Sequence, residues 1–177
     1  AGSPFEQILD LMTALEAAMS GSARSDILLR LRTRCAALLA VRNDAAAAIF
    51  NDVGQLYDLR STLVHGAELR INKLTKLLTS MTYTPAGAPF LEAFGHAVDR
   101  LRDLVRRSIL ARLCLAHGPR HLWPLDDDAQ VDRALADDAQ RRHWRTDWHG
   151  TLAAMGAGHA AVRPIPAVSY LATFSDR

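Results

Sequence analysis

Residues 49–66 read IFNDVGQLYDLRSTLVHG, and no other stretch of the chain constrains the architecture as strongly. Apolar side chains recur in it every three or four residues, which predicts an amphipathic helix with one inward face. Arg60 falls on that face one turn after Leu56, so we expect its guanidinium to meet neighbouring helices. A buried guanidinium without a partner is costly, so Arg60 should have an anionic partner, a wet cleft or a ligand. The inward positions are Ile49, Val53, Leu56, Arg60 and then Leu63 or Val64.

The rest of the chain shows the same helical periodicity, interrupted by glycine, proline and serine. Aromatic residues make up only 6% of the chain while alanine and leucine abound, which favours helices over a sandwich or barrel. We therefore predict an all-α fold, a helical bundle with a less regular C-terminal extension. The expected helices run approximately from Phe5 to Met19, Ser25 to Leu39, Asn43 to Gly66, Ile71 to Met81, Phe90 to Leu115 and Asp126 to Arg142.

Two regions differ in character. Residues 5–118 carry well-formed apolar stripes and are expected to form the bundle, which ends at the stop signal His117-Gly118-Pro119. Residues 119–177 are expected to form an extension, namely a polar helix followed by an extended or partly disordered tail. Acidic residues at the start of that polar helix and Arg141 and Arg142 at its end would complement the helix dipole.

The composition bounds the compartment and the partners. With 49% hydrophobic and 23% charged residues, the 177-residue chain resembles a globular protein. A net charge of +2 is too small to prove a polyanionic partner. No apolar run approaches the roughly 20 residues that span a bilayer, so no membrane association is expected. Two cysteines form no disulfide framework, which favours a reducing, cytoplasmic location.

Arg60 has two interpretations on spacing alone. In the first interpretation, Arg60 is one half of an ion pair with Glu16 or Asp52 as the carboxylate, and His65 meets the carbonyls at the helix end. Alternatively, Arg60 and His65 act together on a ligand. Five residues place them roughly 140° apart around the helix, so they converge only through a bend near Gly66 or across two copies of the chain.

The string from Leu56 to Gly66 resembles the signature of the HEPN superfamily, in particular the Apea-like branch, whose motif reads close to Tyr-x-x-Arg-Ser-x-x-Val-His-Gly. Arg60, Ser61 and His65 fill the superfamily pattern, and the resemblance covers roughly residues 5–115. It implies a helical bundle that dimerises with two motifs facing each other. It also implies a metal-independent endoribonuclease, of toxin or antiviral type, or an inactive relative that binds a partner.

The chemistry fits these residues. RNA supplies its own 2′-hydroxyl nucleophile, an unperturbed histidine exchanges protons near neutral pH, and an arginine stabilises charge on phosphate. We therefore assign catalysis to Arg60 and His65, with Ser61 assisting, and RNA binding to Tyr57, Arg30 and Arg34. Tyr57 has the competing interpretation of a packed core residue. No metal or cofactor is expected, although Cys114, His117 and His121 have ligand-like spacing.

Several interpretations stay open. Arg30 and Arg34 lie one turn apart on the more exposed flank of the second helix, and the arginines of residues 100–112 are expected to form a solvated, salt-bridged face with nearby acids. The leading function is cleavage of single-stranded RNA at a homodimer interface. The alternatives are a non-catalytic module that binds nucleotide, RNA or protein, and an assembly domain in which Arg60 is structural. Further domains of a longer protein, or a neutralising partner, are possible companions.

Overall fold

The computed structural model describes residues 3–22, 25–65, 71–124 and 127–156. In these ranges every regular element is a helix, apart from an isolated β-bridge between Val41 and Asp44, so the all-α prediction is confirmed. The helices are α1 (Pro4–Met19), α2 (Ile27–Leu39), α3 (Ala46–His65), α4 (Ile71–Thr79), α5 (Phe90–His117), α6 (Asp128–Ala136) and α7 (Asp138–Ala154).

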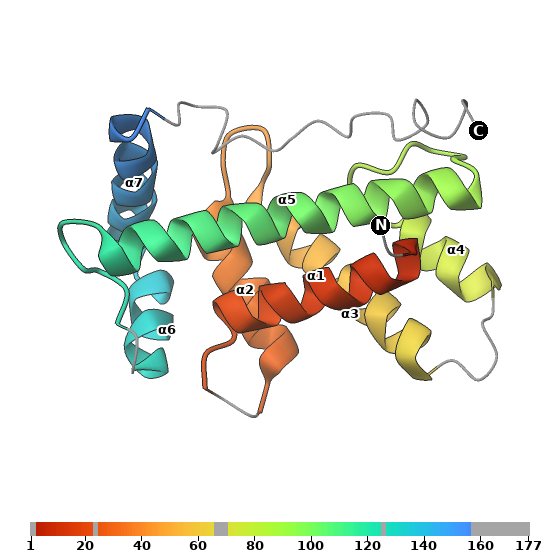
Figure 1. Cartoon of the computed structure of the whole chain (residues 1–177), viewed down its shortest axis with the longest axis horizontal. Helices are drawn as coiled ribbons and strands as arrows, with labels where there is room; N and C mark the ends of the chain where they lie inside the picture. Colours follow the sequence, from red (N-terminus) through yellow and green to blue (C-terminus); the bar gives the residue numbers. More distant parts are fainter. Residues whose placement is uncertain (1–2, 23–24, 66–70, 125–126, 157–177) are drawn as a thin grey trace.

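The long helix α5 organises the molecule. Helix α5 extends along the long axis of the molecule, and α1 packs lengthwise beside it (Figure 1). Helices α2 and α3 pack against each other and close the other side of α1. Helix α4 lies near the start of α5, and α6 and α7 lie near its end (Figure 1). The motif residues on α3 are therefore held by α1 and α2 at one side of the bundle.

Local sequence explains how α1 begins. Ser3 and Glu6 form a capping box, in which the Ser3 hydroxyl accepts from the Glu6 amide and the Glu6 carboxylate accepts from the Ser3 amide. Pro4 occupies the first helical position, where its missing N–H costs nothing. The expected apolar stripe then packs inward, with Met12 and Leu15 fully buried. This places Glu16, the next residue, at the edge of the core.

The region after residue 126 differs from the expected single polar helix. It contains two helices, because Asp137 ends α6 and caps α7 by accepting a hydrogen bond from the Gln140 amide. Trp144 and Trp148 on α7 are buried and belong to the same core as α1 to α5, packing against α5 and α2. A domain boundary at residue 118 stays a prediction. The expected extended tail, residues 157–177, lies outside the described residues.

Within the part of the chain that the structure describes, no helix is both long enough and apolar enough to cross a bilayer.

Candidate functional site

Arg60 lies on the flank of α3 rather than on its inward stripe. The buried stripe runs through Leu56 and Leu59, so the prediction that Arg60 continues it is wrong by one position. One residue corresponds to about 100° of rotation, which is enough to move a side chain from the core to its rim. The Arg60 side chain keeps 31% of its surface exposed. It is therefore accessible to a ligand.

Glu16 of α1 is the anionic partner of Arg60. Arg60 Nη1 donates a hydrogen bond to Glu16 Oε1 over 3.2 Å, and the Glu16 side chain is 22% exposed. The expectation of a carboxylate partner is confirmed, and Glu16 rather than Asp52 fills the role. The contact involves one nitrogen of the guanidinium, so other donors of Arg60 stay available for an anion.

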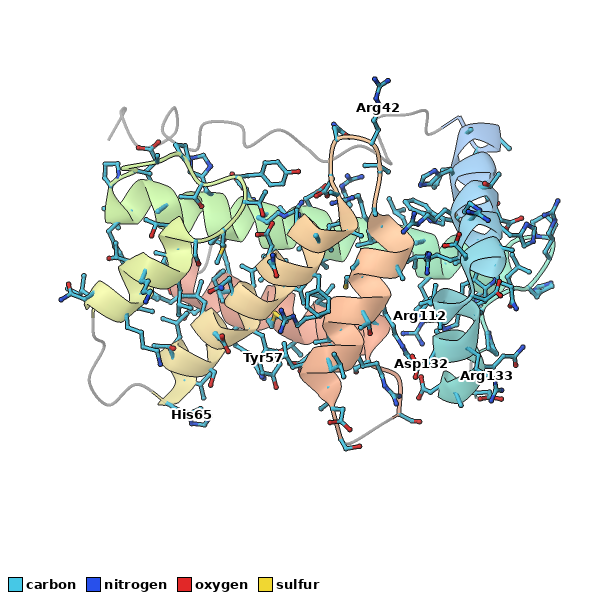
Figure 2. The ribbon with its side chains drawn as sticks, turned by 180° about the vertical axis from the view of Figure 1, so that it is seen from behind. Arg42, Tyr57, His65, Arg112, Asp132 and Arg133 are labelled. Carbon is cyan, nitrogen blue, oxygen red and sulfur yellow. The ribbon has the colours of Figure 1, made fainter. Side chains whose placement is uncertain are left out.

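Ser61 and His65 are both exposed on the last turns of α3. His65 is the final residue of the helix and extends beyond its end, away from the bundle (Figure 2). No hydrogen bond or ion pair joins it to Arg60 within the described residues, as the 140° separation leads us to expect. The bend considered near Gly66 falls outside the described residues. One copy of the chain thus shows no convergence of the two side chains.

Tyr57 is partly buried and packs against the core, in keeping with its interpretation as a packing residue. The Arg60 guanidinium carbon lies 6.0 Å from the centre of its ring, at the outer limit of a cation–π contact. Tyr57 therefore borders the Arg60–Glu16 pair from the same helix. A position that supports Arg60 fits this geometry better than a platform for a base.

Arg34 does not lie on an exposed flank, and that prediction is wrong. Its side chain is 1% exposed. Its guanidinium donates to the Met19 carbonyl over 2.8 Å, to Asp132 Oδ1 over 2.7 Å and to Asp128 Oδ1 over 3.0 Å. Arg30 is partly exposed, but its guanidinium nitrogens lie 3.8 Å from the carboxylate of Asp128 and 3.5 Å from that of Asp132. Helix α6 therefore neutralises both arginines assigned to RNA.

The acidic partner Asp128 is itself anchored to the α1–α2 loop. Its carboxylate accepts from the Ser22 amide over 2.7 Å and from the Ser22 hydroxyl over 2.9 Å. Burial acts to raise the pKa of Asp128, but the hydrogen bonds from Ser22 and Arg34 outweigh it and hold this pKa below its usual range. In Figure 2, Asp132 lies on the side of α6 that faces α2. The acids of α6 thus dock the C-terminal helices.

A buried ionic network crosses the centre of the bundle, and the sequence did not reveal it. Arg100 donates to both oxygens of Asp44 and to Asp52 Oδ2, each over 2.9 Å. Arg107 pairs with Asp44 and with Asp103, its Nε lying 2.9 Å from Asp103 Oδ2. All five side chains are buried. The expected solvated face of α5 is therefore wrong at Arg100 and Arg107.

The network also lowers the pKa of Asp44. Burial acts to raise the pKa of Asp44, but the hydrogen bonds and charges of Arg100 and Arg107 outweigh it and lower that pKa. Thr82 donates to Asp52 through its amide and its hydroxyl, both over 2.9 Å. Every carboxylate is thus paired, as a buried charge requires. The spacing of residues 100, 103 and 107 along one helical face was the only sequence signal for it.

Cys114, His117 and His121 have ligand-like spacing in the sequence, but the structure does not bring them together as a metal site. Within the described residues no group of three or more His, Cys, Asp or Glu side chains could hold a metal ion. Cys114 is buried on α5, and His121 Nδ1 lies 3.0 Å from the Ala116 carbonyl oxygen. Cys114 therefore serves packing, and His121 holds the turn after α5.

No family model, no curated protein and no solved structure matches this chain. The likeness to the HEPN superfamily therefore rests on the motif residues themselves, above all Arg60, Ser61 and His65.

Proposed function

We propose that the chain is a metal-independent endoribonuclease of the HEPN type, which cleaves single-stranded RNA where two copies meet. The observation that carries the proposal is the exposure of the whole motif. Arg60, Ser61 and His65 all reach solvent on the last two turns of α3, and Arg60 is held there through one nitrogen by Glu16. A purely structural arginine would have its donors consumed inside the bundle, as Arg34 and Arg107 do.

The roles follow from the chemistry of each group. The 2′-hydroxyl of the RNA attacks the adjacent phosphorus, and the ester bond to the 5′-oxygen of the next nucleotide breaks, leaving a 2′,3′-cyclic phosphate. Arg60 donates to the non-bridging oxygens, where negative charge builds in the transition state. His65 transfers the proton that the reaction moves from the attacking 2′-hydroxyl to the leaving 5′-oxygen. Ser61 donates a hydrogen bond to phosphate.

A second copy of the chain completes the site in this proposal. Arg60 and His65 of one α3 point in different directions, so the histidine that serves a given Arg60 comes from the other chain. Val64, next to His65, is an apolar residue with 55% of its surface exposed. An exposed apolar side chain beside the motif is suited to contact with a partner helix. We therefore propose a homodimer with two composite sites.

The location proposed for the enzyme is the cytoplasm. Cys35 and Cys114 are both free and buried, which suits a reducing compartment. RNA is the substrate in this compartment, and an unrestrained ribonuclease there would damage its own cell. A neutralising partner, or control by further domains, belongs to the same proposal.

Mixing two inactive variants tests the composite site. Arg60→Ala and His65→Ala chains are each expected to lack cleavage. When they are unfolded together and refolded, half of the dimers contain both variants and carry one intact site. The mixture should therefore recover about a quarter of the native activity. No recovery from a mixture shown to contain the mixed dimer would contradict the shared site.

The second candidate is a non-catalytic HEPN module that binds RNA or a protein. It is favoured by one observation, the neutralisation of Arg30 and Arg34 by Asp128 and Asp132, which removes positive charge that a substrate strand would use. For this module the same dimer binds RNA, or a partner, without cutting it. Binding that Arg60→Ala weakens, with intact RNA recovered afterwards, would identify this function.

A further inference from the structure

A groove of about 970 Å³ opens at the end of the bundle where α3 begins. It is enclosed by the second half of α2, the loop before α3, the end of α6 and the start of α7. Its volume lies at the upper end of the range typical of small-molecule sites, about 300–1,000 Å³. Arg42 stands at the tip of the enclosing loop, whereas His65 lies at the opposite end of α3 (Figure 2). The groove is therefore separate from the motif surface.

Four arginines and one aspartate line the groove, which gives it an excess of positive charge. Arg141 and Arg145 lie one turn apart on α7. Arg42 lines the groove from the loop before α3, where its exposed side chain extends outward from the loop tip (Figure 2). Among the described residues, no ion pair joins Arg42 or Arg145 to a carboxylate, although the charge of Asp138 acts on Arg145. Arg141 pairs with Asp138 and donates to the Leu135 carbonyl over 3.0 Å. Asp132 also lines the groove, but it is engaged by Arg34. The net charge of the lining thus calls for an anion.

The contacts of Arg145 hold it in place and leave part of its guanidinium open. Its Nε donates to the Ala37 carbonyl over 2.6 Å and its Nη2 to the Ala36 carbonyl over 3.3 Å, at the C-terminal end of α2. Nη1 has no partner among the described residues. Burial, and then the charge of Arg141, lower the pKa of Arg145. An anion bound at Nη1 would relieve this repulsion.

The remaining lining is small and apolar. Ala37, Ala40, Val41 and Phe50 lie on the α2 and α3 side, and Leu135 lies on the α6 side. Alanines leave room for a flat or compact group to approach the backbone closely. Ala45 and Ala46 line the groove at the start of α3, and no acidic residue stands in the first turn of that helix. The groove thus combines a cationic rim with an apolar wall.

We propose that this groove binds a small organic phosphate, with Arg141 and Arg145 at the phosphate, Arg42 at the outer rim and the alanine-rich wall at the apolar part of the ligand. The arginine fork matches phosphate geometry and is always charged. This site goes beyond the ribonuclease proposal and does not depend on it, because it shares no residue with the Arg60–His65 surface.

The site is tested by titrating the folded chain with phenyl phosphate and measuring the binding by isothermal titration calorimetry. We expect saturable binding that is about tenfold tighter than binding of inorganic phosphate, because only phenyl phosphate uses the apolar wall. The double variant Arg42→Gln/Arg141→Gln should weaken binding by about tenfold or more. Arg142→Gln is the matched control, since Arg142 is an exposed neighbour on α7 outside the groove, and it should leave affinity within about twofold.

A second variant distinguishes loss of the binding site from misfolding of the chain. Ala136→Glu places a carboxylate at an exposed position of the lining, so it should also abolish binding while circular dichroism stays native. The proposal is overturned if phenyl phosphate does not saturate at millimolar concentration, or if it binds no tighter than inorganic phosphate. Equal weakening by Arg142→Gln would overturn it in favour of diffuse surface charge. Equal affinity for tri-glutamate would overturn it in favour of an acidic peptide site.

Discussion

Arg60 Nη1 and Glu16 Oε1 lie 3.2 Å apart, and this single contact ties the C-terminal half of α3 to α1 at the edge of the core. Both side chains are partly exposed to solvent, Arg60 by 31% and Glu16 by 22%. Its contribution to stability is therefore that of a partly exposed ion pair and not that of a buried one. The size of the stability loss on replacing Arg60 can therefore distinguish a structural role of this residue from the proposed catalytic role.

Replacing Arg60 by alanine should leave the fold intact. We expect the free energy of unfolding to fall by about 1 kcal/mol or less, because the lost pair is partly solvated, while RNA cleavage disappears. Urea denaturation followed by circular dichroism measures the first quantity. Arg133→Ala is the control, since Arg133 is largely exposed and distant from α3 in Figure 2. A loss of about 3–5 kcal/mol would instead mark Arg60 as a buried structural partner and support the assembly domain.

Asp44 should tolerate no loss of charge. Asp44→Asn leaves Arg100 and Arg107 with part of their charge uncompensated in the core, so we expect a loss of about 3–5 kcal/mol, or failure to fold. The same change at the exposed Asp58 of α3 should alter stability by no more than about 0.5 kcal/mol. Equal, small effects at both positions would contradict the network.

Stability should fall in acid. The folded-state pKa values of Asp44 and Asp128 lie below the unfolded value of 3.8, so the unfolded chain binds more protons as the pH drops. The stabilisation from both groups is present above about pH 4 and is lost below it. Asp99 acts in the opposite sense, because burial raises its pKa. Urea midpoints between about pH 6 and pH 3 measure the slope, which Asp128→Asn should flatten. An unchanged slope in that variant would contradict the assignment.

Gly21 is required for two separate reasons, which a matched pair of variants can distinguish. Its φ of +70° is strained for other residues, and a methyl group would collide with the Asp128 carboxylate. Gly87 has a similar φ of +76°, but no atom of the described residues lies within 4 Å of the place of a methyl group. We expect Gly87→Ala to cost about 1 kcal/mol and Gly21→Ala clearly more, because it also displaces Asp128 from Arg34. Equal losses in thermal unfolding would show that the collision is relieved without cost.

Apolar periodicity was sufficient to predict the helices of the bundle, because the stripes of α1, α3 and α5 are long and regular. It could not place charged side chains, since their surroundings depend on segments far away in sequence. Arg34 was assigned to the surface, yet it is buried by carboxylates nearly a hundred residues later. Arg100 was assigned to a solvated face for the same reason, since Asp44 and Asp52 come from other elements.

The sequence was sufficient to predict single features of the candidate site, but not the surroundings of its residues. The need for a carboxylate beside Arg60 follows from the cost of an unpaired guanidinium, and Glu16 meets it. The angular separation of Arg60 and His65 follows from helical geometry alone. What surrounds the motif in a dimer depends on a second chain, which periodicity cannot supply. The break between α6 and α7 was missed because Asp137 caps a helix in the middle of a polar run.

The most direct test of the ribonuclease proposal is cleavage of single-stranded RNA by the purified chain in EDTA, beside His65→Ala, with the product ends identified. We predict cleavage by the native chain that leaves 2′,3′-cyclic phosphate ends and is absent in the variant. Intact RNA after incubation with a folded dimer would contradict the enzyme, as would equal cleavage by His65→Ala.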